Sequence, residues 1–302
     1  MNKLVSVIIP TFSRPMNIKR AICSVINQTY SPIEIIVVDD NGDGTDNQIE
    51  TEKMLSSFIS DKSINYIKHK INKNAQYARN TGIRHAKGRY ITILDDDDEM
   101  LPNKIEQQVL AIESTLEEFK ASYCGCKIYK NGKLLSKKKT TGSGNFQKEL
   151  LMLDWGMGTG SNPLFKREVF DDIGLYDVSF KRRQDIEFMV RYFRKYKIVE
   201  VKDYGIIKHN DSKPKRPDPK GYIKITEHFL QTFSVDIDSY GYDLSCSIRH
   251  AHYFANCLLA FDYHDYITGW ILYLKCLKYK RYSIFKDILR IVKHILYRTG
   301  KR

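Results

Sequence analysis

The sequence predicts an α/β protein in which a mostly parallel sheet is covered by helices on both faces, followed by a helical extension. Three observations indicate this class. Apolar runs rich in β-branched residues alternate with helical patterns over the first hundred residues. These runs are apolar at nearly every position, as expected for strands that are buried on both faces. Beyond residue 221 helical periodicity continues without a strong strand signal.

Each element of the first half has its own signal. The apolar runs that predict strands are Val5–Ile9, Ile33–Val38, Ile64–Lys68 and Tyr90–Leu94. The helical patterns between them are Met16–Asn27, Asp46–Ile59 and Ala75–Ala86, and another helix is expected after Pro102, to about Glu118. The Asn131-Gly132 pair predicts a hairpin that joins Ser122–Tyr129 to Lys133–Ser136.

The bulk composition is that of an ordinary globular protein with a basic end. The net charge is +13, and nine of these charges belong to the segment from Tyr266 onward, which has ten basic residues and one acid. The six cysteines show neither metal-ligand nor disulfide spacing, which predicts a reduced, cytoplasmic protein. The first ten residues resemble neither a signal peptide nor a spanning helix, because Pro10 ends their apolar run.

The run Asp95-Asp96-Asp97-Asp98 carries the most chemical information. It follows a predicted buried strand, and four adjacent carboxylates repel one another unless a cation or donor groups receive them. Polar residues also follow the first two strands, at Pro10–Arg14 and at Asp39-Asp40. Because parallel strands end at one edge of a sheet, the three sets should converge. Mg²⁺ or Mn²⁺ with a nucleotide diphosphate would suit this edge.

These segments together resemble a known family. Val5–Phe12, Ile35–Asp40, Ala78–Ile83 and Ile93–Asp98 occur in the order and spacing of the family-two glycosyltransferases. The resemblance covers roughly residues 3–210. It implies the GT-A fold, a Rossmann-like sheet, and an inverting hexosyltransferase that uses a uridine-linked sugar and a divalent ion. We therefore expect a GT-A domain over residues 1–211, with a nucleotide-binding half at 1–100 and an acceptor half at 101–211.

The resemblance assigns donor and metal roles to residues at the three strand ends. Asp97 corresponds to the direct metal ligand, with Asp95 nearer the ribose and the ion. Asp96 occupies a position that is often serine or alanine, so it could contact the donor sugar or only add charge. The residues implied in nucleotide binding are Pro10, Thr11, Phe12, Arg14, Asp40, Arg79, Asp95 and Asp96, with Asp40 as the contact to uracil.

The family also places a general base at the start of a helix after the acceptor region. Asp185 in Arg183-Gln184-Asp185 matches this position, and Glu187 is the second choice. The implied acceptor residues are Trp155, Arg182 and Arg183, although the two arginines could simply form a solvated face. His209 either approaches the metal or diphosphate, as the resemblance implies, or is structural.

The absence of a Gln-x-x-Arg-Trp signature favours transfer of one sugar rather than processive synthesis. The expected function is transfer from a UDP-sugar to a glycan acceptor, in the form of a lipid-linked sugar, in cell-surface polysaccharide synthesis. A nucleotidyltransferase is disfavoured because Pro10–Arg14 is not a glycine-rich basic loop. A non-catalytic sugar-nucleotide-binding protein is disfavoured by the intact aspartates.

The C-terminal region has a separate argument. A proline-containing linker is expected at residues 212–221, and a basic helical region at 222–302. Apolar residues from Ile284 to Leu296 form one helical stripe, with basic residues on the rest of the surface. This pattern predicts peripheral contact with an anionic membrane on its cytoplasmic face, and the alternative is a packed core helix with a basic outer face. No nucleic-acid partner is expected, and a homo-oligomer stays open.

Overall fold

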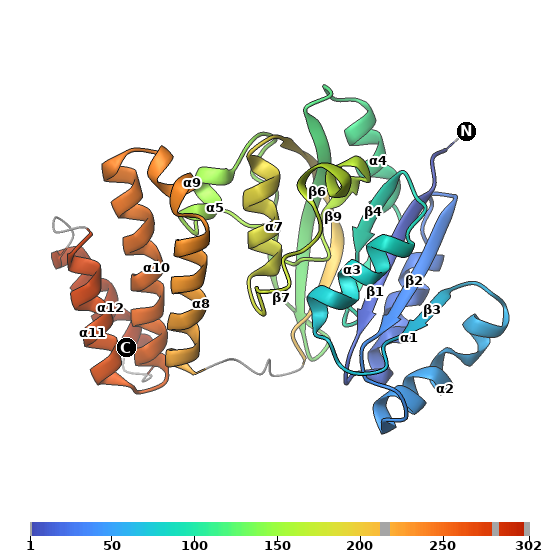
Figure 1. The fold of residues 1–302 in the computed structure, drawn as a ribbon, viewed down its shortest axis with the longest axis horizontal. Coiled ribbons are helices and arrows are strands. Elements are labelled where there is room, and N and C mark those ends of the chain that lie inside the picture. Colours follow the sequence, from blue (N-terminus) through green and yellow to red (C-terminus); the bar gives the residue numbers. More distant parts are fainter. Residues whose placement is uncertain (1, 212–217, 280–283, 299–302) are drawn as a thin grey trace. The chain divides into compact units, whose positions relative to one another are not determined.

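The computed structural model describes residues 2–211, 218–279 and 284–298 (Figure 1). The chain forms two compact units, and each is described by itself. The first unit contains Met1–Gln147 and Gly156–Lys213, and the second contains Lys148–Trp155 and Pro214–Arg302. The segment Lys148–Trp155 therefore leaves the first unit within the region that was expected to form the acceptor half.

The first unit is built on one mixed sheet. Its strands are β1 (Val5–Thr11), β2 (Ile33–Asp39), β3 (Asn65–Lys68), β4 (Tyr90–Ile93), β5 (Asp98–Met100), β6 (Phe119–Lys130), β7 (Lys133–Lys138), β8 (Leu164–Lys166) and β9 (Lys197–His209). They lie in the order β3-β2-β1-β4-β8-β6-β9-β5, and β7 pairs with β6. The helices of this unit are α1 (Pro15–Ile26), α2 (Asp46–Ser60), α3 (Ala75–His85), α4 (Lys104–Glu113), α6 (Glu168–Ile173) and α7 (Gln184–Phe193).

The half of the sheet from β3 to β4 is parallel, as the sequence predicts. Strand β1 is buried on both faces. Val7 on one face belongs to the core that contains Ile22 of α1, while Ile8 on the other face meets α3 at Gly82. A Cβ atom at Gly82 would lie 2.3 Å from Ile8 Cγ2, so the close packing of α3 requires glycine there.

The other half of the sheet is mixed. Strand β8 runs antiparallel to β4 and β6, and β5 runs antiparallel to β9. The predicted hairpin is confirmed as β6 and β7, and Asn131 and Gly132 have the positive φ values that a tight turn requires. Strand β5 was not predicted, and it begins at Asp98, so the last aspartate of the run is already part of the sheet.

The second unit is helical. Its helices are α8 (Pro219–Thr232), α9 (Ser234–Ser239), α10 (Tyr242–Asp262), α11 (Tyr266–Leu277) and α12 (Ile284–Arg298), and the short helix α5 (Gln147–Leu151) leads into its first segment. Leu151 fixes that segment, because its carbonyl oxygen lies 2.9 Å from His252 Nε2 of α10. Among the described residues, no helix combines the length and the apolar character that crossing a bilayer requires.

Two boundaries differ from the sequence prediction. The expected linker at 212–221 is too long, because α8 begins at Pro219, whose fixed φ suits the first turn of a helix, and Asp218 caps it through Gly221 N at 2.7 Å. Residues 212–217 of that linker lie outside the described residues. The helix after Pro102 ends at Glu113 rather than near Glu118, since strand β6 begins at Phe119.

Candidate active site

The carboxyl ends of β1, β2 and β4 converge as predicted. Asp40 N donates to Thr11 O at 3.0 Å, which joins the ends of β1 and β2. Thr11 Oγ1 donates to Asp96 Oδ2 at 2.7 Å, which joins β1 to the aspartate run. The edge of the parallel half-sheet therefore brings together the residues that the sequence predicted there.

The four aspartates alternate between two environments. Asp95 to Asp98 form a tight turn, in which Asp98 N donates to Asp95 O at 2.9 Å. The side chains of Asp95 and Asp97 are 29% and 20% exposed, while Asp96 and Asp98 are buried. The run therefore presents two carboxylates to solvent and uses the other two inside the protein.

The two buried aspartates have protein partners. Asp98 Oδ2 accepts hydrogen bonds from Thr159 Oγ1 at 2.7 Å and Ser161 Oγ at 2.6 Å. Burial raises the pKa of Asp98 to about 7, and the nearby Asp95 charge contributes further. Burial likewise raises the pKa of Asp96 to about 7, against the opposing effect of the Arg14 charge. Asp98 is thus hydrogen-bonded inside the protein, and Asp96 likewise lies inside the protein rather than at its surface.

Two arginines, Arg14 at the N-cap of α1 and Arg20 within the helix, offset the negative charge of the aspartate run. Arg14 pairs with both Asp96, at 2.7 Å from Nη2 to Oδ1, and Asp97 Oδ2. Arg20 donates to the carbonyl oxygen of Asp97 at 3.0 Å and pairs with Glu99 at 3.2 Å. Burial raises the pKa of Asp97, an effect that the Arg14 charge opposes. Arg20 was not identified from the sequence. Its position in the helix that follows β1 is the feature that could have indicated a role near the strand ends.

Arg79 links the aspartate run to the helix of the predicted base. Arg79 Nη2 donates to Asp95 Oδ1 at 2.9 Å, and its guanidinium lies 5.7 Å from the centre of the Tyr176 ring. A Cβ atom on Gly160 would lie 3.8 Å from Asp185 Cβ and 4.0 Å from Arg79 Nη2. Gly160 therefore lies between Asp185 and Arg79, beside the exposed edge of the run.

The two candidate bases both lie on α7, in different environments. Asp185, in its first turn, is half-buried, whereas Glu187 is buried and bonded to Arg191, with Nη2 to Oε2 at 3.0 Å. Arg191 also donates to Leu175 O at 2.8 Å, so Glu187 and Arg191 fix the loop before the helix. Glu187 is therefore engaged in an ion pair with Arg191, while Asp185 stays the predicted base. Arg183, just before the helix, has a positive φ of 61°.

The loop before α7 is also fixed by α3, through residues that the sequence did not identify. Asn80 Nδ2 donates to Tyr176 O at 2.8 Å, and Tyr176 N donates to Asn80 Oδ1 at 3.0 Å. Gln76 Nε2 donates to Phe180 O. One helix therefore carries Arg79 into the site and holds the loop that leads to Asp185.

The other predicted donor residues lie around β1 and β2. Asp40 is buried, and its carboxylate accepts from His69 Nδ1 at 2.7 Å, from Lys73 N at 2.8 Å and from Asn72 Nδ2 at 2.9 Å. Much of its hydrogen-bonding capacity thus holds its own loop. Pro10 is half-buried, and Phe12 is 49% exposed.

The predicted acceptor residues are divided between the units. Arg182 is exposed and Arg183 half-buried, both in the first unit just before α7. Trp155 belongs to the second unit, where its backbone N donates to Glu149 O at 3.2 Å. Trp155 therefore belongs to a different compact unit from Asp97 and Asp185, and its acceptor role stays a prediction.

The site offers oxygen ligands for a divalent ion. His209 Nε2 lies 2.6 Å from Glu99 Oε1, so this histidine is engaged within the β5–β9 pair. No cluster of three or more His, Cys, Asp or Glu side chains suited to a metal occurs among residues 2–211, 218–279 and 284–298. The two partly exposed carboxylates, Asp95 and Asp97, fit Mg²⁺ or Mn²⁺ in the manner of sites where substrate phosphates complete the coordination.

A mixed sheet whose parallel half ends in an acidic run defines the GT-A class of glycosyltransferase fold, and solved structures agree. The chain is similar to Staphylococcus aureus TarS residues 1–349 in complex with UDP-GlcNAc, with a TM-score of 0.67 at 14% identity over 98% of this chain and 92% of that one. It is also similar to the mannosyltransferase PcManGT from Pyrobaculum calidifontis in complex with GDP-Man and Mn²⁺, with a TM-score of 0.55 at 18% identity over 98% and 87%.

The chain belongs to glycosyl transferase family 2, whose model matches residues 6–174. An uncharacterized glycosyltransferase of Rickettsia prowazekii is 34% identical over 198 residues, which are 63% of this chain and 59% of the relative. Escherichia coli WfgD, a UDP-Glc:α-D-GlcNAc-diphosphoundecaprenol β-1,3-glucosyltransferase, is 40% identical over 106 residues, 35% of this chain and 40% of the relative. The match thus spans only part of these curated relatives.

Proposed function

We propose that the chain transfers one sugar, with inversion at the anomeric carbon, from a UDP-sugar to a lipid-linked glycan acceptor in cell-surface polysaccharide synthesis. The observation that carries this proposal is the approach of Asp185 to the Arg79–Asp95 pair across Gly160. It sets a candidate base beside the edge at which a nucleotide diphosphate is expected. The donor and acceptor names of WfgD and the UDP-GlcNAc complex of TarS support the chemical class of both substrates.

In this proposal the first unit binds the nucleotide at the ends of β1, β2 and β4. Phe12 covers the base, Asp40 contacts uracil, and Arg14 and Arg79 meet the diphosphate. Both arginines are already paired with the carboxylates Asp97 and Asp95, so a bound diphosphate would compete for them and leave carboxylate oxygens for the metal. Asp95 and Asp97 would hold Mg²⁺ or Mn²⁺, which supplies positive charge to the departing diphosphate.

Asp185 performs the proton transfer in the proposed mechanism. Its carboxylate accepts the proton of the acceptor hydroxyl while that oxygen forms a bond to the anomeric carbon. The bond from the anomeric carbon to the diphosphate oxygen breaks on the opposite face, and UDP takes the electron pair. Arg182 and Arg183, just before α7, suit an acceptor phosphate by charge. The left-handed backbone of Arg183 directs the chain into the helix that presents Asp185.

A panel of UDP-sugars tests the donor class. The protein is incubated with each sugar nucleotide and Mn²⁺ or Mg²⁺, and UDP release is measured with and without chelator. We expect metal-dependent release from one UDP-sugar above the others. Release from a GDP-sugar alone, or release that the chelator leaves unchanged, would contradict the uridine or the metal assignment respectively.

A further inference from the structure

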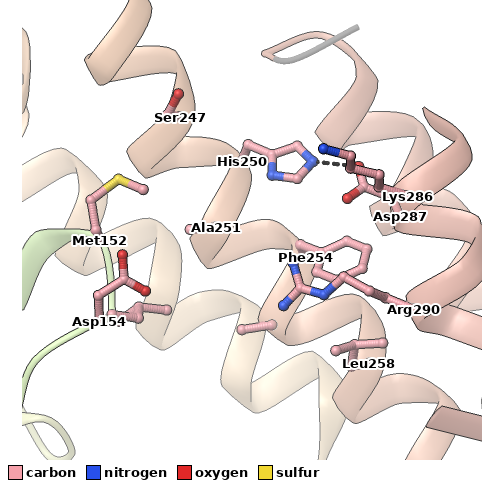
Figure 2. A pocket seen from close by; sticks show the side chains of 12 residues that line it. Met152, Asp154, Ser247, His250, Ala251, Phe254, Leu258, Lys286, Asp287 and Arg290 are labelled. Carbon is pink, nitrogen blue, oxygen red and sulfur yellow. Dashed lines mark hydrogen bonds and ion pairs between the residues drawn. The ribbon is translucent and has the colours of Figure 1, made fainter. Parts of the chain in front are cut away.

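Within the second unit, helix α12 packs against the other helices through its polar side. Asp287 is buried, and its Oδ2 lies 2.8 Å from His250 Nε2 of α10 (Figure 2). His294, two turns further along, has its Nε2 2.8 Å from Asp262 Oδ1 at the end of α10. Ile291 is buried on this same side. These two polar pairs and Ile291 therefore contribute to holding the described part of α12 in place.

The outward side of α12 is apolar. Phe285 is 81% exposed, and the next residues along the same stripe, Ile288, Leu289 and Val292, are 40–44% exposed. Their spacing of three, four and seven residues from Phe285 puts them on one face of the helix. A helix of a globular protein ordinarily buries such a stripe. The alternative of a core helix with a basic outer face is therefore wrong for the described part of α12.

Helix α11 repeats this arrangement. Ile267, Trp270, Ile271 and Leu274 have the same spacing and are 47–77% exposed. The two helices are neighbours, because Tyr273 Oη donates to the carbonyl oxygen of Ile284 at 3.3 Å. Single exposed apolar residues are common on protein surfaces, whereas extended apolar stripes mark a surface that contacts another apolar phase.

The charges beside the two apolar stripes indicate which kind of partner contacts them. Lys278, Lys286, Arg290 and Lys293 are exposed, and Asp287, the acid of the described α12, is buried against His250. The helical spacing puts Lys286 and Lys293 at the border of the apolar stripe, where their ammonium groups can meet lipid phosphates. A second copy of the chain would bring like charges together, and a nucleic acid offers no apolar phase to the stripes.

We propose that α11 and α12 form a docking surface whose apolar stripes enter the headgroup boundary of an anionic lipid bilayer. Trp270, whose ring is partly exposed on α11, suits this boundary because it is apolar with one polar N–H group. The proposal goes beyond the sugar-transfer function and does not depend on it, because it rests on the second unit alone.

Flotation of the full chain with phosphatidylcholine vesicles, with and without phosphatidylserine, tests the proposal. We expect binding that requires phosphatidylserine and weakens with salt. Lys286→Gln combined with Lys293→Gln should lower partitioning roughly 30-fold, at the usual contribution of about 1 kcal/mol for each basic residue near an anionic surface. Phe285→Ser combined with Leu289→Ser should also lower it.

The matched control changes two exposed leucines of the first unit, Leu110 and Leu116, to serine. This control should bind vesicles like the parent, and thermal unfolding should show that all three variants fold. Equal vesicle binding by the parent and both α12 variants would overturn the docking surface. A concentration-dependent dimer that Phe285→Ser and Leu289→Ser abolish, without vesicle binding by the parent, would assign the stripes to a second copy. Competition of vesicle binding by duplex DNA at equal charge would assign the basic residues to nucleic acid.

Discussion

Arg79 Nη2 donates to Asp95 Oδ1 at 2.9 Å, and this pair joins the two ends of the candidate site. Asp95 belongs to the aspartate run, and Arg79 lies on the helix that also fixes the loop before α7 through Asn80. Gly160 lies between Arg79 and Asp185, and because it has no side chain it leaves space between them. The donor edge and the candidate base are therefore held by one set of contacts around α3.

Removal of the proposed metal ligand should weaken nucleotide binding only when metal is present. Asp97 is partly exposed and faces Arg14, so Asp97→Ala removes a ligand without emptying a core position. We expect calorimetry to show a lower UDP affinity in Mn²⁺ and little change in chelator. Asp172→Ala, at an exposed carboxylate bonded to Lys195, is the control. Unchanged metal-dependent affinity of Asp97→Ala would remove this residue from the ligand set.

The size of the residue at 160 should control access to Asp185. A Cβ atom there makes ordinary contacts with Asp185 and Arg79, so Gly160→Ala should fold and retain transfer. Gly160→Leu puts a larger side chain into the space beside the base and should reduce the transfer rate about 10-fold or more, because small misplacements of reacting groups are costly. UDP affinity, measured in parallel, should stay near the parental value. A leucine variant with the full transfer rate would show that acceptors do not use this space.

The contact between α3 and the loop should contribute strongly to stability. Asn80 is buried and satisfies both backbone groups of Tyr176. Asn80→Leu leaves those groups unpaired and should lower the free energy of unfolding by about 2 kcal/mol or more in urea titrations. Asn47→Leu, at a position where the amide donates to the exposed Ser13 hydroxyl, should change it by less than about 0.5 kcal/mol. Equal effects of the two substitutions would contradict this role of Asn80.

Buried Lys104 should make stability rise with pH. Its Nζ donates to Gln108 Oε1 at 2.7 Å, and burial lowers its pKa to about 8. Between pH 8 and 9 the unfolded chain keeps this proton while the folded protein loses it, so the free energy of unfolding should increase by about 1 kcal/mol. Burial raises the pKa of the neighbouring Cys124. Because a Lys104→Met variant keeps this thiol, a comparison of that variant with the parent isolates the contribution of Lys104.

Lys104→Met removes the titrating amine and should remove most of this rise. Urea unfolding of the parent and the variant at pH 8 and pH 9 gives the difference directly. A variant whose stability rises with pH as steeply as the parent's would show that Lys104 is not the source.

Much of the first unit could be predicted from the sequence. The strands β1, β2 and β4 are apolar runs that end in polar residues, and the rule that parallel strands end together put Thr11 beside the aspartate run. Which aspartates of the run are buried and which are exposed could not be predicted, because this depends on partners that are distant in the sequence. Thr159 and Ser161 bury Asp98, and Thr11 with Arg14 encloses Asp96.

The second unit was less predictable for a similar reason. Trp155 lies next in sequence to glycines of the first unit, yet Leu150 and Leu151 of its own segment are buried with the helices of the second. The periodicity of α12 placed Phe285, Ile288, Leu289 and Val292 on one apolar face, but the predicted stripe also contained Ile291, which is buried on the packed side, and Ile295 and Leu296, whose side chains lie outside the described ones. Periodicity does not reveal which side packs, and the pairs formed by Asp287 and His294 turn the stripe outward.

The transfer rate and donor affinity of Asp185→Asn test the central claim most directly. The substitution keeps the size of the side chain but removes the carboxylate that would accept the acceptor's proton. We expect transfer to fall by a factor of about 10²–10⁴, the usual contribution of a general base, while the dissociation constant for the UDP-sugar stays within about twofold. An Asp185→Asn protein that transfers sugar at the parental rate would contradict the assignment of Asp185 and the proposed mechanism.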